Sequence, residues 1–132
     1  MKSVTILVIE RDKSQNDSYV KTLRSAGHQV EAALDGKSAI SIIDKGFEPD
    51  IIFVDLRMPD IEGVNFLKKY KPSAHPHTVV VVFSNFSAHT GVDQAHQLGV
   101  HRYILKSRAS SHELLRIVDS IVSERSSIDR IV

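Results

Sequence analysis

The fold that this sequence predicts is decided by residues 50–59, which read DIIFVDLRMP. Their first half is a short run of Ile, Phe and Val without polar alternation, a pattern typical of a parallel strand covered on both faces. The run ends in a carboxylate, Asp55, and a loop with Pro59 and then Gly63 follows. In an open parallel sheet, ligands and chemistry collect at the carboxyl ends of the strands. Asp55 is therefore the first candidate for a functional side chain.

Short apolar runs of this kind alternate with amphipathic stretches along the whole chain. The predicted strands are Val4–Ile9, Gln29–Leu34, Asp50–Val54, Val79–Phe83 and Tyr103–Leu105. Helical spacing predicts four helices that end near Gly27, Gly46, Pro72 and Gly99, and a capping box, Ser110-x-x-Glu113, begins a fifth. Strict alternation with right-handed crossovers predicts a parallel sheet with helices on both faces. We expect one α/β domain, a three-layer αβα sandwich.

Composition and charge exclude several classes of partner and site. The 132 residues suffice for about one domain with a single core, and 17 basic against 16 acidic residues give a net charge of +1. Proteins that bind nucleic acid are usually strongly and locally basic, so we expect no direct nucleic-acid partner. The chain has no cysteine, which excludes disulfides and zinc–thiolate sites.

The ends of the chain and its hydropathy lead to expectations about location and extent. No apolar run approaches the ~18 residues that a membrane span needs, and the first apolar run is too short for a signal peptide. We therefore expect a cytoplasmic protein without a membrane partner. The domain is predicted at residues 1–124, followed by a short tail at 125–132 in which helical patterning weakens. No output module follows, which favours a regulator with a single domain.

Four polar features occur in a fixed order at the ends of the predicted strands. An acid follows the first, an aspartate ends the third, a hydroxyl ends the fourth and a lysine ends the fifth. With this set the chain resembles the receiver domain of two-component response regulators over essentially its whole length. The matching stretches are ILVIE (6–10), DIIFVDLRMP (50–59) with Gly63, VVVVFS (79–84) and GVHRYILK (99–106). The resemblance implies a flavodoxin-like (βα)5 fold with strand order 2-1-3-4-5, in which these strand ends converge.

The resemblance also implies a role for each polar residue. Asp55 would be the nucleophile that accepts a phosphoryl group from a phosphohistidine, and Lys106 would hold the phosphoryl oxygens. Ser84 would donate its hydroxyl to the phosphate. Tyr103 would be the aromatic switch that moves inward when Ser84 is recruited. The face formed by the fourth helix, the fifth strand and the fifth helix would change with them.

A Mg²⁺ site is implied as well, formed by Glu10, Asp55 and the backbone carbonyl of Arg57. The family normally has two adjacent acids after the first strand, but Arg11 stands at the second position. Adding Arg11 and Lys106 to the two carboxylates gives a pocket charge of zero. A guanidinium about 4 Å from a carboxylate near a surface is worth roughly 4 kcal/mol of attraction. We hypothesise that Mg²⁺ binds weakly or not at all, with two alternatives open: Asp12 substitutes as a ligand, or Arg11 faces solvent.

The family's lysine is commonly followed by a proline in a cis peptide bond, whereas Ser107 follows Lys106 here. A non-proline cis bond costs about 2.5–4 kcal/mol, so the loop is either trans and differently shaped, or strained.

The resemblance implies a signalling protein rather than an enzyme, whose own chemistry is limited to self-catalysed phosphoryl transfer and autodephosphorylation. The expected partners are a sensor histidine kinase or a histidine phosphotransfer protein, together with an effector that reads the switching face. The sequence leaves the oligomeric state open, with a homodimer as one candidate. An alternative function is a phosphorylation-independent interaction module on a receiver scaffold, for which Arg11 is the main support.

Overall fold

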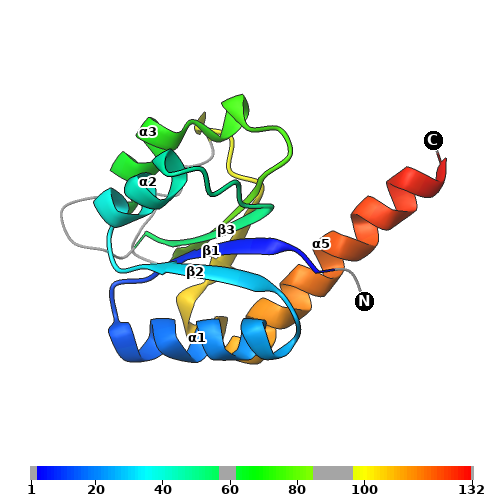
Figure 1. Ribbon diagram of the computed structural model, residues 1–132, viewed down its shortest axis with the longest axis horizontal. Coiled ribbons are helices and arrows are strands. Elements are labelled where there is room, and N and C mark those ends of the chain that lie inside the picture. Colours follow the sequence, from blue (N-terminus) through cyan, green and yellow to red (C-terminus); the bar gives the residue numbers. More distant parts are fainter. Residues whose placement is uncertain (1–2, 57–61, 85–96, 132) are drawn as a thin grey trace.

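The computed structural model describes residues 3–56, 62–84 and 97–131, and for residues 62, 84 and 126–131 it describes the backbone alone. Five strands form one parallel sheet in the order β2-β1-β3-β4-β5 (Figure 1). The strands are β1 Thr5–Ile9, β2 Gln29–Ala33, β3 Ile51–Asp55, β4 Val79–Ser84 and β5 Arg102–Leu105. The described helices are α1 Lys13–Ser25, α2 Gly36–Asp44, α3 Glu62–Tyr70 and α5 Ser111–Ile131, with short 3-10 helices at Pro72–Ala74 and Lys106–Arg108.

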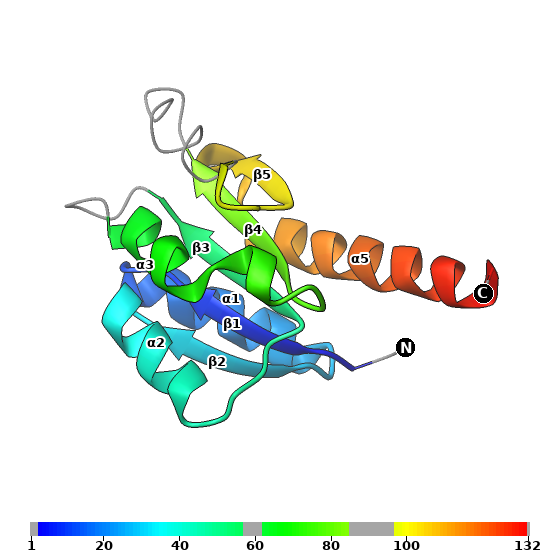
Figure 2. The ribbon, with the colours of Figure 1, turned by 90° about the horizontal axis from the view of Figure 1, so that it is seen from above.

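Helices cover both faces of the sheet, as Figures 1 and 2 show: α1 and α5 lie on one face, and α2 and α3 lie on the other. The central strand β3 has every residue buried. Ile52 and Val54 pack in the core under α2 and α3, whereas Ile51 and Phe53 pack in the core under α1 and α5. The apolar run of β3 is continuous because neither of its faces meets water. The predicted three-layer sandwich and flavodoxin-like strand order are confirmed.

The described helix ends follow the signals in the sequence. Gly27 and Gly46 adopt φ angles of 95° and 106° just after α1 and α2, a left-handed conformation that glycine tolerates best. Asp35 caps the start of α2 by accepting a hydrogen bond from a backbone N–H. At α5, the Glu113 N–H donates to Ser110 Oγ over 3.1 Å, which is the expected cap.

Two segments differ from the sequence expectation or lie outside the described residues. The fourth predicted helix falls mostly within residues 85–96, outside the described part, although Gly99 at its predicted end is described with a φ of 92°. Helix α5 continues through residues 125–131, where weak patterning predicted fraying, and its end extends beyond the sheet (Figure 2). In the described part of the chain, no helix is long and apolar enough to cross a membrane.

Candidate functional site

Three strand ends bring the predicted site residues together at one edge of the sheet. Asp55 is the last residue of β3, and Glu10 and Lys106 directly follow β1 and β5. Lys106 Nζ lies 3.5 Å from Asp55 Oδ2 and donates a hydrogen bond to Glu10 Oε1. The two acids are almost completely buried, with exposed fractions of 1% for Glu10 and 2% for Asp55. The structure thus forms a buried pocket in which one ammonium group contacts two carboxylates.

The side chain of Lys106 is itself only 12% exposed, so its charge depends on its neighbours. Burial alone would lower the pKa of Lys106, but the hydrogen bond to Glu10 and the charges of Asp55 and Glu10 raise it above its usual value. The ammonium also lies over two aromatic rings, 4.9 Å from the ring centroid of Phe83 and 5.3 Å from that of Tyr19. Lys106 is therefore held as a cation at neutral pH.

Packing explains why residue 63, in the first turn of α3, is a glycine. A Cβ atom at Gly63 would lie 2.9 Å from the backbone oxygen of Asp55 and 3.1 Å from a side-chain carbon of Leu56. The first turn of α3 therefore approaches the end of β3 closely enough that only glycine fits without a shift. This contact places α3 directly behind the backbone of Asp55.

Arg11 and Asp12 lie outside the buried pocket. The side chain of Arg11 is exposed, which corresponds to the solvent-facing alternative. Asp12 caps α1 by accepting a hydrogen bond of 3.0 Å from the Gln15 N–H, while its own N–H donates to Glu10 Oε2. Asp12 thus has a structural role at the start of α1, and its backbone helps to fix Glu10.

The described residues offer a divalent cation a poor donor set. Glu10 and Asp55 supply two carboxylates, but both already contact Lys106. The described part of the chain contains no group of three or more His, Asp or Glu residues arranged to hold a metal ion. The carbonyl of Arg57 lies outside the described residues. Among the described residues, Glu10 and Asp55 are the carboxylates that could hold a cation, and the binding of Mg²⁺ stays a prediction.

The two predicted switch residues lie on neighbouring strands. Ser84 ends β4 and pairs in register with Leu105, so its backbone lies beside that of Lys106, but its side chain is outside the described atoms. Tyr103 lies on β5 with 37% of its surface exposed. The phosphate-binding role of Ser84 and the switching role of Tyr103 stay predictions.

The loop after β5 forms without a cis bond, because no described peptide bond is cis. Lys106 begins a 3-10 turn, and the Ala109 N–H closes it by donating to the Lys106 carbonyl over 3.0 Å. The carbonyl of Ala109 in turn accepts a hydrogen bond of 2.6 Å from the hydroxyl of Tyr19 on α1. The trans alternative for Lys106–Ser107 is the one that the structure shows.

Sequence reasoning missed Tyr19 as a member of this pocket. Helical spacing identified it only as part of the apolar face of α1. Its hydroxyl lies 3.3 Å from Lys106 Nζ, and its ring is completely buried. The available signal was a phenol at a buried position on the helix that follows Glu10, since a buried phenolic hydroxyl usually needs a hydrogen-bond partner.

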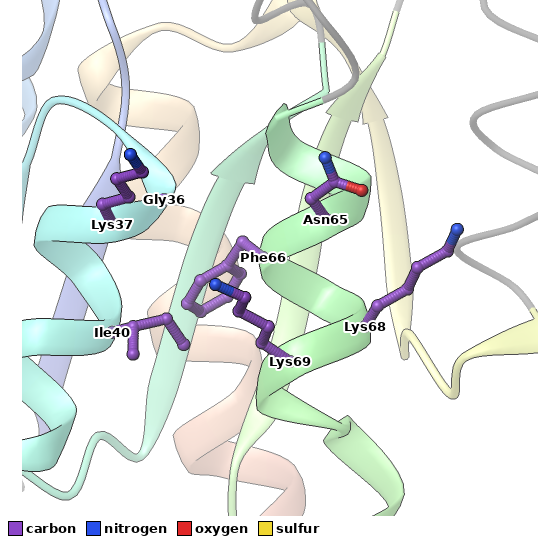
Figure 3. A pocket seen from close by; sticks show the side chains of 7 residues that line it. All are labelled: Gly36, Lys37, Ile40, Asn65, Phe66, Lys68 and Lys69. Carbon is purple, nitrogen blue, oxygen red and sulfur yellow. The ribbon is translucent and has the colours of Figure 1, made fainter.

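Two surface hollows lie away from the Asp55 pocket. One of about 320 Å³ lies between α2 and α3 (Figure 3). Phe66 and Ile40 point toward each other across it, and the amino group of Lys69 extends over the same gap, whereas Lys68 points away from α2. Another hollow of about 530 Å³ lies near the amino ends of β3 and β4. Neither contains a predicted site residue, so the site is identified by charge and position rather than by cavity size.

The fold agrees with comparisons to known proteins. The chain belongs to the response regulator receiver domain family, whose sequence profile matches residues 6–119. A CheY-like receiver domain protein from Methanospirillum hungatei has the same fold, with a TM-score of 0.81 and 21% identity over 96% of this chain and 98% of that chain. The receiver domain of a Francisella response regulator has a TM-score of 0.75 and 25% identity over 93% of this chain and 98% of that chain.

Curated relatives are longer proteins that share this segment. A protein-glutamate methylesterase/protein-glutamine glutaminase from Myxococcus xanthus is 28% identical over 85% of this chain and 32% of its own length. The response regulator protein VraR of Staphylococcus saprophyticus is 31% identical over 70% of this chain and 44% of its own length. The sensor kinase CckA of Brucella abortus is 29% identical over 64% of this chain and 9% of its own length. This chain thus spans less than half of each of these relatives.

Proposed function

We propose that this chain accepts a phosphoryl group on Asp55 from a phosphohistidine donor and thereby controls a partner protein. The observation that carries the proposal is the contact between Asp55 Oδ2 and Lys106 Nζ, 3.5 Å apart in a buried pocket at the carboxyl edge of the sheet. A carboxylate held beside a fixed ammonium is a competent acceptor, because the cation can stabilise the negative oxygens of the incoming group.

The transfer is a displacement at phosphorus. A carboxylate oxygen of Asp55 attacks the phosphoryl group, the P–N bond to the donor histidine breaks, and the ring nitrogen keeps the electron pair. The product is an acyl phosphate, which adds roughly one further negative charge at this position. Lys106 is shared with Glu10 before transfer, and the added charge draws it toward the phosphoryl oxygens.

We further propose that the new phosphoryl group shifts a conformational equilibrium. Recruitment of the Ser84 hydroxyl would favour an inward position of Tyr103, whose side chain is partly exposed in the structure. The surface that includes β5 and α5 would change with Tyr103, as a shift between two pre-existing states. The expected partners are a sensor histidine kinase or a histidine phosphotransfer protein as donor, and an effector that reads this surface.

Phosphoryl transfer to the purified protein tests the proposal directly. Incubation with acetyl phosphate, with and without Mg²⁺, should yield an acid-stable, base-labile adduct that intact-protein mass spectrometry detects. The variant Asp55→Asn should yield none under the same conditions, because an amide is a poor nucleophile. An adduct of equal yield in the Asp55→Asn variant would refute the assignment of Asp55.

A second candidate function is supported by one specific observation. Glu10 and Asp55 both pair with Lys106, and the exposed Arg11 stands where the family has a second acid, so the two buried carboxylates are balanced in part without a bound cation. This is the arrangement expected of a phosphorylation-independent interaction module. Failure to form an adduct with acetyl phosphate or to bind beryllofluoride, with or without Mg²⁺, would favour it.

A further inference from the structure

We propose that the hydroxyl of Tyr19 is a positioning group for Lys106, holding the ammonium between Glu10 and Asp55 while it ties α1 to the loop after β5. The inference rests on the proposed phosphoacceptor function for its consequence, a faster transfer to Asp55, but its structural part stands on the unphosphorylated protein. It assigns a role in the reaction to a residue that the helical pattern identifies only as core.

Two hydrogen bonds define the geometry around the hydroxyl. Tyr19 donates its proton to the Ala109 carbonyl over 2.6 Å, and it accepts a hydrogen bond of 3.3 Å from Lys106 Nζ. Because the single phenolic proton is used on Ala109, the lone pairs of the oxygen are left for the ammonium. The hydroxyl is thus oriented as an acceptor toward Lys106.

The same hydroxyl fixes both ends of the lysine. Lys106 begins the 3-10 turn that the Ala109 N–H closes on the Lys106 carbonyl, so holding Ala109 also holds the backbone of Lys106. The side chain is held separately, at Nζ. A long side chain that is fixed at its base and at its tip has already lost much of its rotamer freedom before the reaction. The reaction step therefore carries less of the entropy cost of ordering the lysine.

The ring of Tyr19 contributes separately from its hydroxyl. It lies 5.3 Å from Lys106 Nζ and 5.8 Å from the ring of Phe83, which also contacts the ammonium. Burial raises the pKa of Tyr19, while Lys106 acts against that rise, so the hydroxyl stays neutral at physiological pH. The substitution Tyr19→Phe therefore keeps the ring contacts and removes only the two hydrogen bonds.

The chain contains a matched control on the opposite face of the sheet. Tyr70 on α3 is also buried, with 4% of its surface exposed, and its hydroxyl makes no hydrogen bond among the described residues. The substitution Tyr70→Phe likewise removes one buried hydroxyl, but far from Lys106 in the fold. Comparing the two variants separates an effect on the pocket from the general effect of losing a phenol.

The first measurement is the rate of adduct formation with acetyl phosphate at several concentrations. Tyr19→Phe should lower the maximal rate about tenfold, as expected for losing a hydrogen bond to a charged group, with little change in the concentration that gives half of that rate. Tyr70→Phe should stay within about twofold of the original protein. Equal maximal rates for Tyr19→Phe and the original protein would overturn the inference.

The second measurement needs no phosphorylation. The ammonium protons of a buried, hydrogen-bonded lysine exchange slowly with water, so selective ¹⁵N labelling of lysine should give an observable Lys106 signal. Tyr19→Phe should speed this exchange and Tyr70→Phe should not; equal exchange in both variants would overturn the inference. If the original protein forms no adduct at all, the proposed function fails, while this measurement still decides the role of Tyr19.

Discussion

The two faces of the sheet each bury one tyrosine, and the two residues have different chemistry. Tyr19, on α1, packs on the sheet face that α1 and α5 cover. Its hydroxyl donates a hydrogen bond to the Ala109 carbonyl and accepts one from Lys106. Tyr70, under the α2 and α3 face, stacks on Phe66 and on His75, with ring centroids 5.6 and 4.0 Å apart respectively, and its hydroxyl has no hydrogen-bond partner among the described residues. Equal burial therefore does not indicate equal function.

The electrostatics of the two tyrosines agree with this difference. Burial raises the pKa of both phenols. At Tyr19 the opposing influence is the charge of Lys106, whereas at Tyr70 it is the neutral hydroxyl of Thr78, which itself donates to the Pro49 carbonyl. Thr78 lies near enough to affect Tyr70 without forming a hydrogen bond of good geometry to it. One face thus holds the charged site, and the other is mainly packing.

The largest effect should come from removing the cation on the charged face. Lys106→Met leaves Glu10 and Asp55 buried without their counter-ion, which should cost about 3–5 kcal/mol of unfolding free energy at neutral pH. Adduct formation should fall more than about 100-fold, because the cation that stabilises the phosphoryl oxygens is gone. Urea unfolding and mass spectrometry measure the two quantities. Lys69→Met, in the α2–α3 hollow, is the control and should change stability by less than about 0.5 kcal/mol.

On the face covered by α2 and α3, a substitution should change the unfolding free energy strongly and the rate of adduct formation little. Phe66→Ala removes a buried ring that stacks on Tyr70, and should lower the unfolding free energy by about 3–5 kcal/mol. The rate of adduct formation per folded molecule should stay within about threefold, since the pocket is built on the other side of β3. A rate that falls as far as in Lys106→Met would show that the two faces are not separable.

A smaller effect is expected at the rim of the charged face. Arg11→Asp adds a carboxylate beside Glu10 and removes a positive charge, which should raise Mg²⁺ affinity at least about tenfold. Isothermal titration of Mg²⁺ into both proteins measures this change. Arg11→Gln, which removes the charge without adding a ligand, should raise the affinity less. Sub-millimolar Mg²⁺ binding by the original protein would contradict the hypothesis that Arg11 weakens the metal site.

The smallest effect concerns pH and the opposite edge of the sheet. His28 Nδ1 accepts a hydrogen bond from the Val4 N–H, and burial lowers the pKa of His28. At a pH below the ordinary pKa of histidine, the His28 imidazole is protonated in the unfolded state but stays neutral in the folded state. The free energy of unfolding should therefore fall as the pH decreases from about 6.5 toward the folded-state pKa. Urea unfolding at several pH values should show this loss, and His28→Gln, which cannot titrate, should show a shallower one. If the unfolding free energy of His28→Gln depends on pH as steeply as that of the original protein, His28 is not the cause of the loss.

The sequence predicted the fold and the charged core of the site because both depend on coarse patterns. Continuous apolar runs indicated buried parallel strands, and parallel strands bring their carboxyl ends to one edge, so Asp55, Glu10 and Lys106 had to converge. The sequence leaves the side-chain direction of Arg11 open, because a residue in a loop has no periodicity to orient it. The roles of Asp12 as a cap and of Tyr19 as a partner of Lys106 depend on individual hydrogen bonds between elements, which no local pattern encodes.

Helix α5 connects the two edges of the sheet. It begins at Ser111, just after the loop of Lys106, and farther along it Arg125 contacts Asp50, with 3.5 Å between Nη1 and Oδ1, and donates to the His77 carbonyl. A continuous helix of 21 residues is about 30 Å long, so a tilt of about two degrees at its start displaces its end by about 1 Å. Helix α5 thus links the loop that carries Lys106 to the segments that carry Asp50 and His77 at the amino edge of the sheet.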